Sequence, residues 1–311
     1  MPNVSVKWSL FTISLVVIAL ALALPWVDDL SAWRAIVQDL RGPRVLTAAG
    51  VGALLALAGL ALQVLLRNPL ADPYILGTSS GAAVGAISAL LLFGGLMWLG
   101  AACGALAAGA LLLILSRGAI SARADDGSSK LILTGAMLAA VLGAVSTLLL
   151  TLTPDERLRG AIFWLIGDLS GAASGEWAIG FAFLFIAYYH HRARAIDRLM
   201  LGSEAAHLLG EPVARLRREL ISWACLATAL AVSLAGSIGF IGLVVPQALR
   251  LAGIRTTRPL AAMSAVGGAV LLVAADTLAR CVAWPLELPV GAIMSLLGAP
   301  VFIWFLARRA A

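Results

Sequence analysis

Residues 45–66 read VLTAAGVGALLALAGLALQVLL, a run of 22 positions without a charged side chain. An α-helix rises about 1.5 Å per residue, so this run would be about 33 Å long, close to the thickness of the apolar core of a bilayer. Apolar residues do not alternate with polar ones here, as they do in the strands of an outer-membrane barrel. The run therefore predicts a membrane-spanning helix.

The whole chain shares this character. It has 311 residues, of which 61% are hydrophobic and 12% are charged, whereas soluble globular chains carry about 45–50% apolar and about 25% charged residues. This composition excludes a soluble enzyme and a disordered chain. At about 20 residues per span, it predicts an all-α polytopic membrane protein with about ten transmembrane helices in a single domain, residues 1–311.

Ten apolar segments are candidates for these helices. The first follows Lys7 and could be a signal peptide, but no Ala-x-Ala site follows it, so we interpret it as a retained helix. The eighth is short and contains Pro246 and Arg250. Short or broken helices of this kind are tolerated where protein or a cavity surrounds them. The segments lie near residues 9–25, 45–66, 75–93, 97–116, 131–152, 176–190, 219–236, 239–253, 260–279 and 290–307.

The loop charges predict the orientation. With the N-terminus inside, the inner loops hold sixteen of the 22 Lys and Arg residues, and basic residues favour cytoplasmic loops. Both termini are therefore expected in the cytoplasm. The longest hydrophilic stretch, about residues 191–217, is then cytoplasmic. Within it Ser203 could cap a short helix that Gly210 ends, and that helix could dock on a partner or lie on lipid headgroups.

A second unusual segment follows residue 66. Pro69 and Pro73 interrupt a helix because each lacks an N–H, and Gly77, Gly81 and Gly85 recur at a spacing of four, which permits close approach of a neighbouring helix. Residues 77–81, GTSSG, also fit the nucleophile-elbow pattern G-x-S-x-G, but no strand or nearby histidine accompanies them. An intramembrane enzyme is therefore disfavoured, and we assign no catalytic residue.

Other ligand-binding patterns are missing from the sequence. Neither of the two lysines follows a glycine, so there is no P-loop. The three cysteines are far apart and suggest neither a disulfide nor a metal site, and no basic soluble face predicts nucleic-acid binding. No acidic or histidine residue lies deep within a predicted span, which weakens a secondary transporter, the alternative function.

Charged residues near the outer face are few. Asp276 and Arg280 are spaced to pair within one helix, and Arg41 and Arg44 bracket Gly42-Pro43 before the second span, where they could anchor the chain at the interface.

These motifs together resemble the permease subunits of type II ABC importers for iron–siderophores, haem and cobalamin, the FecCD-like transport family. The resemblance spans nearly the whole chain, with its motifs in the same order. The matching pieces are residues 41–44 (RGPR), 50–63 (with Gly50, Gly59 and Gln63), 67–73 (RNPLADP), 76–77 with 80–83, 133–135, Trp164 with Gly167, 201–202 with Ala206 and 209–210, 236–246 (GSIGFIGLVVP) with Arg250, Asp276 with Arg280, 287–291 (ELPVG) and 298–300 (GAP).

The resemblance implies an assembly in the bacterial inner membrane. Such permeases pair as homo- or heterodimers, and the translocation path lies at the subunit interface. Two cytoplasmic ATPase subunits bind ATP–Mg²⁺, and a periplasmic binding protein delivers the substrate. This chain itself would bind no cofactor and no metal.

The resemblance also implies site residues. Arg41, Arg44 and Arg280 would meet acidic residues of the binding protein, and opposite charges across an interface fix its register. The segment 201–210 would be the coupling helix, which docks in the ATPase subunit. A further set of residues would pack the membrane helices together or gate the path between them. The coupling set is Leu201, Gly202, Ser203, Glu204, Ala205, Ala206, His207, Leu208, Leu209 and Gly210, and the packing set is Asn68, Pro69, Gly77, Gly81, Gly85, Gly239, Gly242 and Pro246.

One position departs from the family pattern. The family commonly has a histidine after the proline of the 236–246 run, and this chain has Gln247. Glutamine keeps hydrogen-bonding groups but does not titrate near neutral pH, so we assign no proton or metal role there. The sequence does not identify the substrate among iron chelates, haem and cobalamin.

Overall fold

The computed structural model describes residues 4–24, 30–121, 126–171 and 175–310. The described residues are helical, with short connections, and contain no strand. The elements are α1 (Val4–Ala23), α2 (Leu30–Ala35), the π-helix η1 (Ile36–Arg41), α3 (Gly42–Leu65), the 3₁₀-helix η2 (Pro73–Leu76), α4 (Thr78–Phe93), α5 (Met97–Leu115), α6 (Arg117–Ser121), α7 (Asp126–Thr151), α8 (Asp155–Ile166), α9 (Gly175–Met200), α10 (Ser203–Leu208), α11 (Val213–Ala235), α12 (Ile241–Leu251), α13 (Thr257–Cys281) and α14 (Val290–Ala310).

The stretch 45–66 forms the centre of the bundle. It makes up most of α3, which packs against α9, α11, α12 and α13. Close packing is possible because small residues face one another: Gly52 meets the backbone of Gly268 on α13, and Gly59 meets that of Gly242 on α12. In a bilayer such interfaces replace the hydrophobic effect as the source of helix association. This long apolar helix is thus surrounded by protein.

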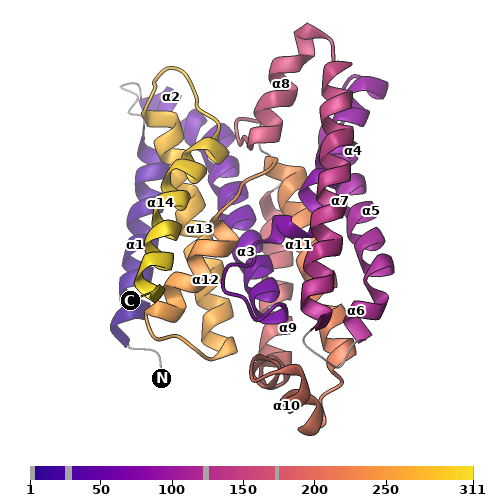
Figure 1. The fold of residues 1–311 in the computed structure, drawn as a ribbon. Coiled ribbons are helices and arrows are strands. Elements are labelled where there is room, and N and C mark those ends of the chain that lie inside the picture. The colour runs from indigo at the N-terminus through magenta and orange to yellow at the C-terminus, as the bar shows by residue number, and fades with distance from the viewer. Residues whose placement is uncertain (1–3, 25–29, 122–125, 172–174, 311) are drawn as a thin grey trace.

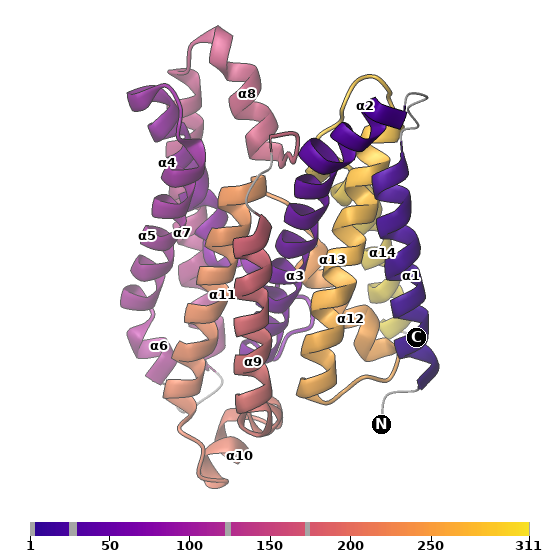
Figure 2. The same cartoon turned by 180° about the vertical axis from the view of Figure 1, so that it is seen from behind.

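Two groups of helices flank this centre. Figure 1 shows α4, α5, α6 and α7 on one side and α1, α12, α13 and α14 on the other, with α3, α9 and α11 between them, and Figure 2 shows the same arrangement from behind. The helix α8 lies at one end of the bundle, and α10 projects at the opposite end. We call these the α8 end and the α10 end.

The predicted segments correspond to helices of the structure. Each of the ten contains or overlaps one of α1, α3, α4, α5, α7, α9, α11, α12, α13 and α14, and the predicted end of the first, near residue 25, lies outside the described residues. By length and composition, five helices of the described part are able to cross a membrane. The number of crossings and the cytoplasmic position of both termini remain predictions; α1 begins and α14 ends toward the α10 end.

The structure corrects the predicted boundaries of the hydrophilic stretch. The helix expected over 176–190 continues to Met200, and α11 begins at Val213, so most of the predicted loop 191–217 is helical. The reason is that Ala195, Ile196 and Leu199 recur at helical spacing among the charged residues and are buried. Only residues 201–212, including α10, connect the two long helices.

Candidate functional sites at both ends of the bundle

A network of ion pairs occupies the α8 end. Arg44, in the first turn of α3, donates from Nε and Nη2 to the Asp276 carboxylate of α13 at 2.8–3.1 Å and from Nη1 to Glu287 Oε2 at 2.7 Å. Arg280 Nε lies 3.2 Å from Asp276 Oδ2. Two parallel donors on one carboxylate fix its orientation. The network therefore ties α3 to α13 and to the connection before α14.

The same arginines hold the end of α1. Arg41 Nη1 donates to the Leu22 carbonyl at 2.8 Å, and Arg280 donates to the carbonyls of Ala21 and Leu24 at 3.0 and 3.2 Å. The last carbonyls of a helix lack partners within it and carry partial negative charge. Two buried guanidinium groups satisfy that need here.

These contacts locate the three predicted docking arginines. Arg41, Arg44 and Arg280 converge at one end of the bundle, as the resemblance implies, but all three are buried. The predicted pair of Asp276 and Arg280 is confirmed, while the interpretation of Arg44 as an interfacial anchor outside the span is corrected, because its guanidinium lies in the protein. Glu287, whose side chain is 42% exposed, is the accessible member of the network.

A cavity of about 800 Å³ adjoins this network and includes Glu287 in its wall. Its lining combines aromatic and apolar side chains with a few charged ones, as in sites that hold small molecules. Helices α5, α8 and α11 and the connection before α14 contribute to it, through residues that include Met97, Trp98, Glu156, Arg159, Phe163, Trp164, Asp168 and Ser233.

A buried polar contact stabilises the short helix α12. Pro246 has no N–H, so the carbonyl of Gly242, four residues earlier, loses its helical partner. Gln63 of α3 supplies a replacement, because its Nε2 donates to the Gly242 carbonyl at 3.1 Å. The Gly59–Gly242 approach brings the two backbones close enough for this contact. Of the predicted packing residues, Gly242 and Pro246 thus belong to one arrangement. Gly239 is less closely packed, because among the described residues an added Cβ would meet just the edge of the Tyr74 ring, at 4.0 Å.

The proline segment forms a turn followed by a close helix pair. The Asn68 side chain accepts from Leu70 N, and that of Asp72 accepts from Tyr74 N, which shapes the chain around Pro69 and Pro73. Asp72 is half-buried, and burial raises its pKa to about 6, although the bond from Tyr74 N opposes this shift.

The three predicted glycines divide into two roles. Gly81 and Gly85 face the backbone of α5 at Gly104 and Gly100. Gly77 precedes α4 in a left-handed conformation, with φ of +77°, and faces α7 instead. The predicted common face is therefore limited to Gly81 and Gly85.

At the α10 end, polar contacts fix the connection between α9 and α11. Arg217, buried on α11, donates from Nη2 to Ser203 Oγ at 2.6 Å, and Arg198 pairs with Glu211. Asp197 of α9 accepts from Thr257 N at 3.0 Å at the start of α13. Ser203 is therefore a partner of Arg217 and does not cap α10; Gly202 precedes the helix, and Gly210, with φ of +81°, follows its end as predicted.

The predicted coupling residues have two different environments. Ala206 is fully buried, and Gly202 and Ser203 are buried as well. Leu201, Leu208 and Leu209 are exposed together with Glu204, His207 and Gly210, and Ala205 is half-buried. An apolar surface surrounded by polar residues is typical of a protein contact. The exposed leucines are therefore the side chains that a partner could contact.

Sequence reasoning missed two residues of these sites. Gln63 and Glu287 belong to matched family motifs but received no role. Two features of the sequence could have identified Gln63. It is a glutamine in an otherwise apolar run, and a buried amide needs a hydrogen-bonding partner. The proline inside the later helix α12 leaves a carbonyl that can be that partner. Among the described residues no cluster of three His, Cys, Asp or Glu side chains could hold a metal ion.

Comparisons with known proteins agree with this architecture. Residues 6–308 match the FecCD transport family. The chain is similar to the vitamin B12 import system permease protein BtuC of Vibrio cholerae, with 39% identity over 91% of this chain and 87% of that protein. It is also similar to the cobalamin import system permease protein BtuC of Halobacterium salinarum, with 42% identity over 88% and 74% of the two chains.

A solved structure supports the same relationship. The inward-facing conformation of a metal-chelate type ABC transporter superimposes with a TM-score of 0.85 and 27% identity, covering 98% of this chain and 99% of that one. A chain in the structure of PsaBC from Streptococcus pneumoniae in complex with Fab has a TM-score of 0.59 at 15% identity, covers 88% of this chain and 93% of that one, and shares the fold alone.

Proposed function

Because the chain belongs to the FecCD transport family and is the permease subunit of an ABC importer, we propose that it carries a bulky metal chelate across the bacterial inner membrane. Cobalamin is the first candidate, since the relatives named above import it, and ferric siderophores and haem are the others. The observation that carries this proposal is the match over residues 6–308.

The α10 end is proposed as the ATPase contact. The exposed leucines of α10 would enter the ATPase subunit, and the contacts of Arg217, Arg198 and Asp197 would transmit its movement to α9, α11 and α13. ATP–Mg²⁺ would bind to that separate subunit, and this chain would bind no cofactor.

The α8 end is proposed as the docking face for a periplasmic binding protein. Arg41, Arg44 and Arg280 with Asp276 and Glu287 carry one net positive charge, which an acidic surface complements. Because the arginines are buried, the partner's carboxylates would reach Arg44 from the side of Glu287. The adjoining cavity would receive the released substrate.

A second permease subunit is proposed to cover α7. That helix is the least buried of the five candidate spans, at 17% of its apolar window. Leu133, Met137, Val141, Val145 and Leu148 are exposed along it at helical spacing. In the assembled importer this stripe would face the partner subunit and the shared path.

Reconstitution in liposomes tests the proposal. Purified chain, ATPase and binding protein together should accumulate labelled cobalamin in an ATP-dependent manner, and omission of either partner should abolish uptake. A ferric siderophore and haem serve as parallel substrates. Uptake by the chain alone under a proton or sodium gradient would contradict the proposal and favour a secondary transporter.

A further inference from the structure

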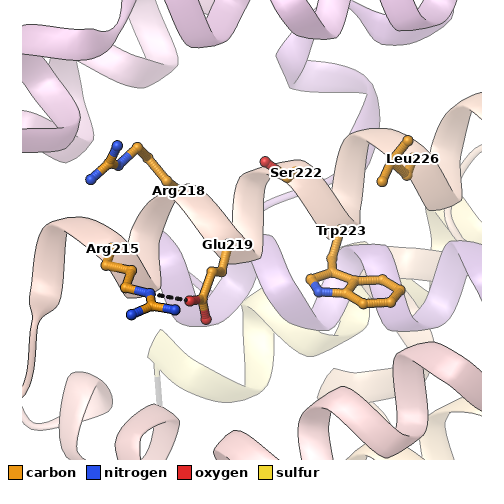
Figure 3. A pocket seen from close by; sticks show the side chains of 6 residues that line it. All are labelled: Arg215, Arg218, Glu219, Ser222, Trp223 and Leu226. Atoms are coloured by element: carbon orange, nitrogen blue, oxygen red, sulfur yellow. Dashed lines mark hydrogen bonds and ion pairs between the residues drawn. The ribbon is translucent and has the colours of Figure 1, made fainter.

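Two adjoining hollows lie along the first half of α11, toward the α10 end, and the second of them also touches α5 and α6. One, of about 430 Å³, is lined by Arg215, Arg218, Glu219, Ser222, Trp223 and Leu226 (Figure 3). The other, of about 440 Å³, is lined by Leu113, Ile114, Arg117, Arg218 and Ser222. Since both include Arg218 and Ser222, they form one surface that we call the α5–α11 groove.

The chemistry of the groove changes in order along the helices. Arg218, Ser222 and Leu226 follow one another at intervals of four on the same side of α11 (Figure 3). A cation is thus followed by a hydroxyl and then by an apolar side chain over about 12 Å. On the neighbouring α5, Leu113 and Ile114 precede Arg117 at the same end of the bundle. Both walls are cationic toward the α10 end and apolar toward the middle of the bundle.

The positive charge of the groove is only partly compensated. Its lining holds three arginines and one glutamate. Glu219 already pairs with Arg215 at 2.9 Å and with Arg192 at 2.7 Å. The only hydrogen bond that the described residues show for Arg218 runs from Nε to the Ala214 carbonyl at 3.4 Å. Arg117 and Arg218 are exposed and able to donate to an anion.

We propose that the α5–α11 groove binds an anionic phospholipid. The phosphodiester would accept from Arg117 and Arg218, the glycerol region would lie at Ser222, and an acyl chain would follow Leu226 and Ile114. Basic pockets between helices at the cytoplasmic surface suit anionic headgroups. A zwitterionic lipid would leave the excess positive charge uncompensated, and a free phosphate would leave the apolar walls unused. This site is independent of the transported substrate.

Native mass spectrometry of the detergent-purified chain tests the proposal with dioleoyl-phosphatidylglycerol and dioleoyl-phosphatidylcholine. The unchanged chain should retain phosphatidylglycerol in preference to phosphatidylcholine. The double variant Arg117→Gln/Arg218→Gln should bind phosphatidylglycerol about 30-fold more weakly, at about fivefold per arginine. The matched control is Arg255→Gln/Arg258→Gln, two exposed arginines outside the groove, which should bind as the unchanged chain does.

A second variant addresses the apolar half. Ser222→Phe fills the groove and keeps both arginines, and it should also reduce phosphatidylglycerol binding. Equal retention of the two lipids, or unchanged binding by either variant, would overturn the proposal. So would displacement of the lipid by millimolar inorganic phosphate, which would indicate a phosphate ion site. Loss of ATPase association in the double variant with lipid binding unchanged would identify the groove as a protein contact instead.

Discussion

At the scale of single residues, several polar side chains of this bundle stabilise the fold by pairing with other buried polar groups, a role that the overall composition does not reveal. Gln63 compensates the carbonyl that Pro246 leaves without a partner, and Asp276 holds two arginines. In an apolar surrounding an unpaired polar group costs far more than the bond itself contributes. Each of these residues is therefore expected to be sensitive to substitution even without contact to a substrate.

Substitution of Gln63 should destabilise the protein. Gln63→Leu leaves the Gly242 carbonyl without a donor in a buried site and should lower the free energy of unfolding by about 1–3 kcal/mol. Thermal unfolding in detergent measures the loss. The matched control is Thr47→Val on the same helix, whose hydroxyl donates to the Pro43 carbonyl one turn earlier, within the helix itself. Equal losses in the two variants would contradict the assigned role of Gln63.

Asp72 should give the stability a dependence on pH. Its pKa is raised from 3.8 to about 6 in the folded chain, so the folded state binds the proton more tightly and loses stability as the pH rises from about 4 to 6. Asp72→Asn keeps an acceptor for Tyr74 N but does not titrate. The melting temperature of Asp72→Asn minus that of the unchanged chain should therefore increase over this range. The exposed Asp155→Asn variant serves as the control for the loss of a surface carboxylate. A difference for Asp72→Asn that stays constant with pH would refute the assignment.

At the scale of elements, the two long helices α9 and α11 project beyond the apolar bundle and hold α10 between them. Isolated helices of six residues are unstable in water, so α10 depends on its attachments. The buried Ala206 and the Ser203–Arg217 contact provide them. This element therefore has an inner face that serves the fold and an outer face available to a partner.

Two substitutions in α10 should separate these faces. Leu208 is 81% exposed, so Leu208→Glu should weaken ATPase association about 30-fold, as for a central interface residue, while the melting temperature of the chain alone stays the same. Ala206→Asp buries a carboxylate and should lower that melting temperature. Pull-down with the ATPase and thermal unfolding measure the two effects. Leu92→Glu, in the last turn of α4, where Arg157 of α8 donates to the Leu90 carbonyl, is the control for an added surface charge at the α8 end. Unchanged ATPase binding by Leu208→Glu would disprove the proposed contact.

At the scale of the whole molecule, charge is separated between the two ends. The α8 end combines buried arginines with an accessible carboxylate at the wall of the large cavity, and the α10 end carries exposed arginines around the α5–α11 groove. The apolar surface between them suits lipid or a second subunit. Each end thus offers a different chemistry to its surroundings.

Glu287 should limit the docking of an acidic binding protein. Glu287→Gln removes the accessible negative charge beside Arg44 and should strengthen docking about threefold at low salt, an effect that 0.5 M NaCl should abolish. Surface plasmon resonance with immobilised permease measures it. Glu176→Gln, an exposed carboxylate on α9, serves as control. Arg44→Glu is less suitable, because it would place a third carboxylate beside Asp276 and Glu287. Weaker docking of Glu287→Gln at low salt would contradict the proposal.

The sequence by itself determined the class of this protein and the approximate position of its long helices. A continuous apolar run such as residues 45–66 is unfavourable in water. In a bilayer it forms a helix, because a helix pairs the backbone N–H and C=O groups within the segment itself. The family motifs likewise depend on residue order alone. Those features are local, and residue types within one segment are sufficient to specify them.

The tertiary structure alone decided which residues far apart in the sequence meet. Arg44 and Asp276 are separated by 232 positions, and Gln63 and Gly242 by 179, so no local pattern could pair them. The predicted loop 191–217 was mostly helical because burial of Ile196 and Leu199 outweighed the surrounding charge. Helix packing also decides which face of α10 is buried and which groups the arginines of the α8 end contact. A buried polar group must find a hydrogen-bonding partner, and packing determines which partner lies within reach.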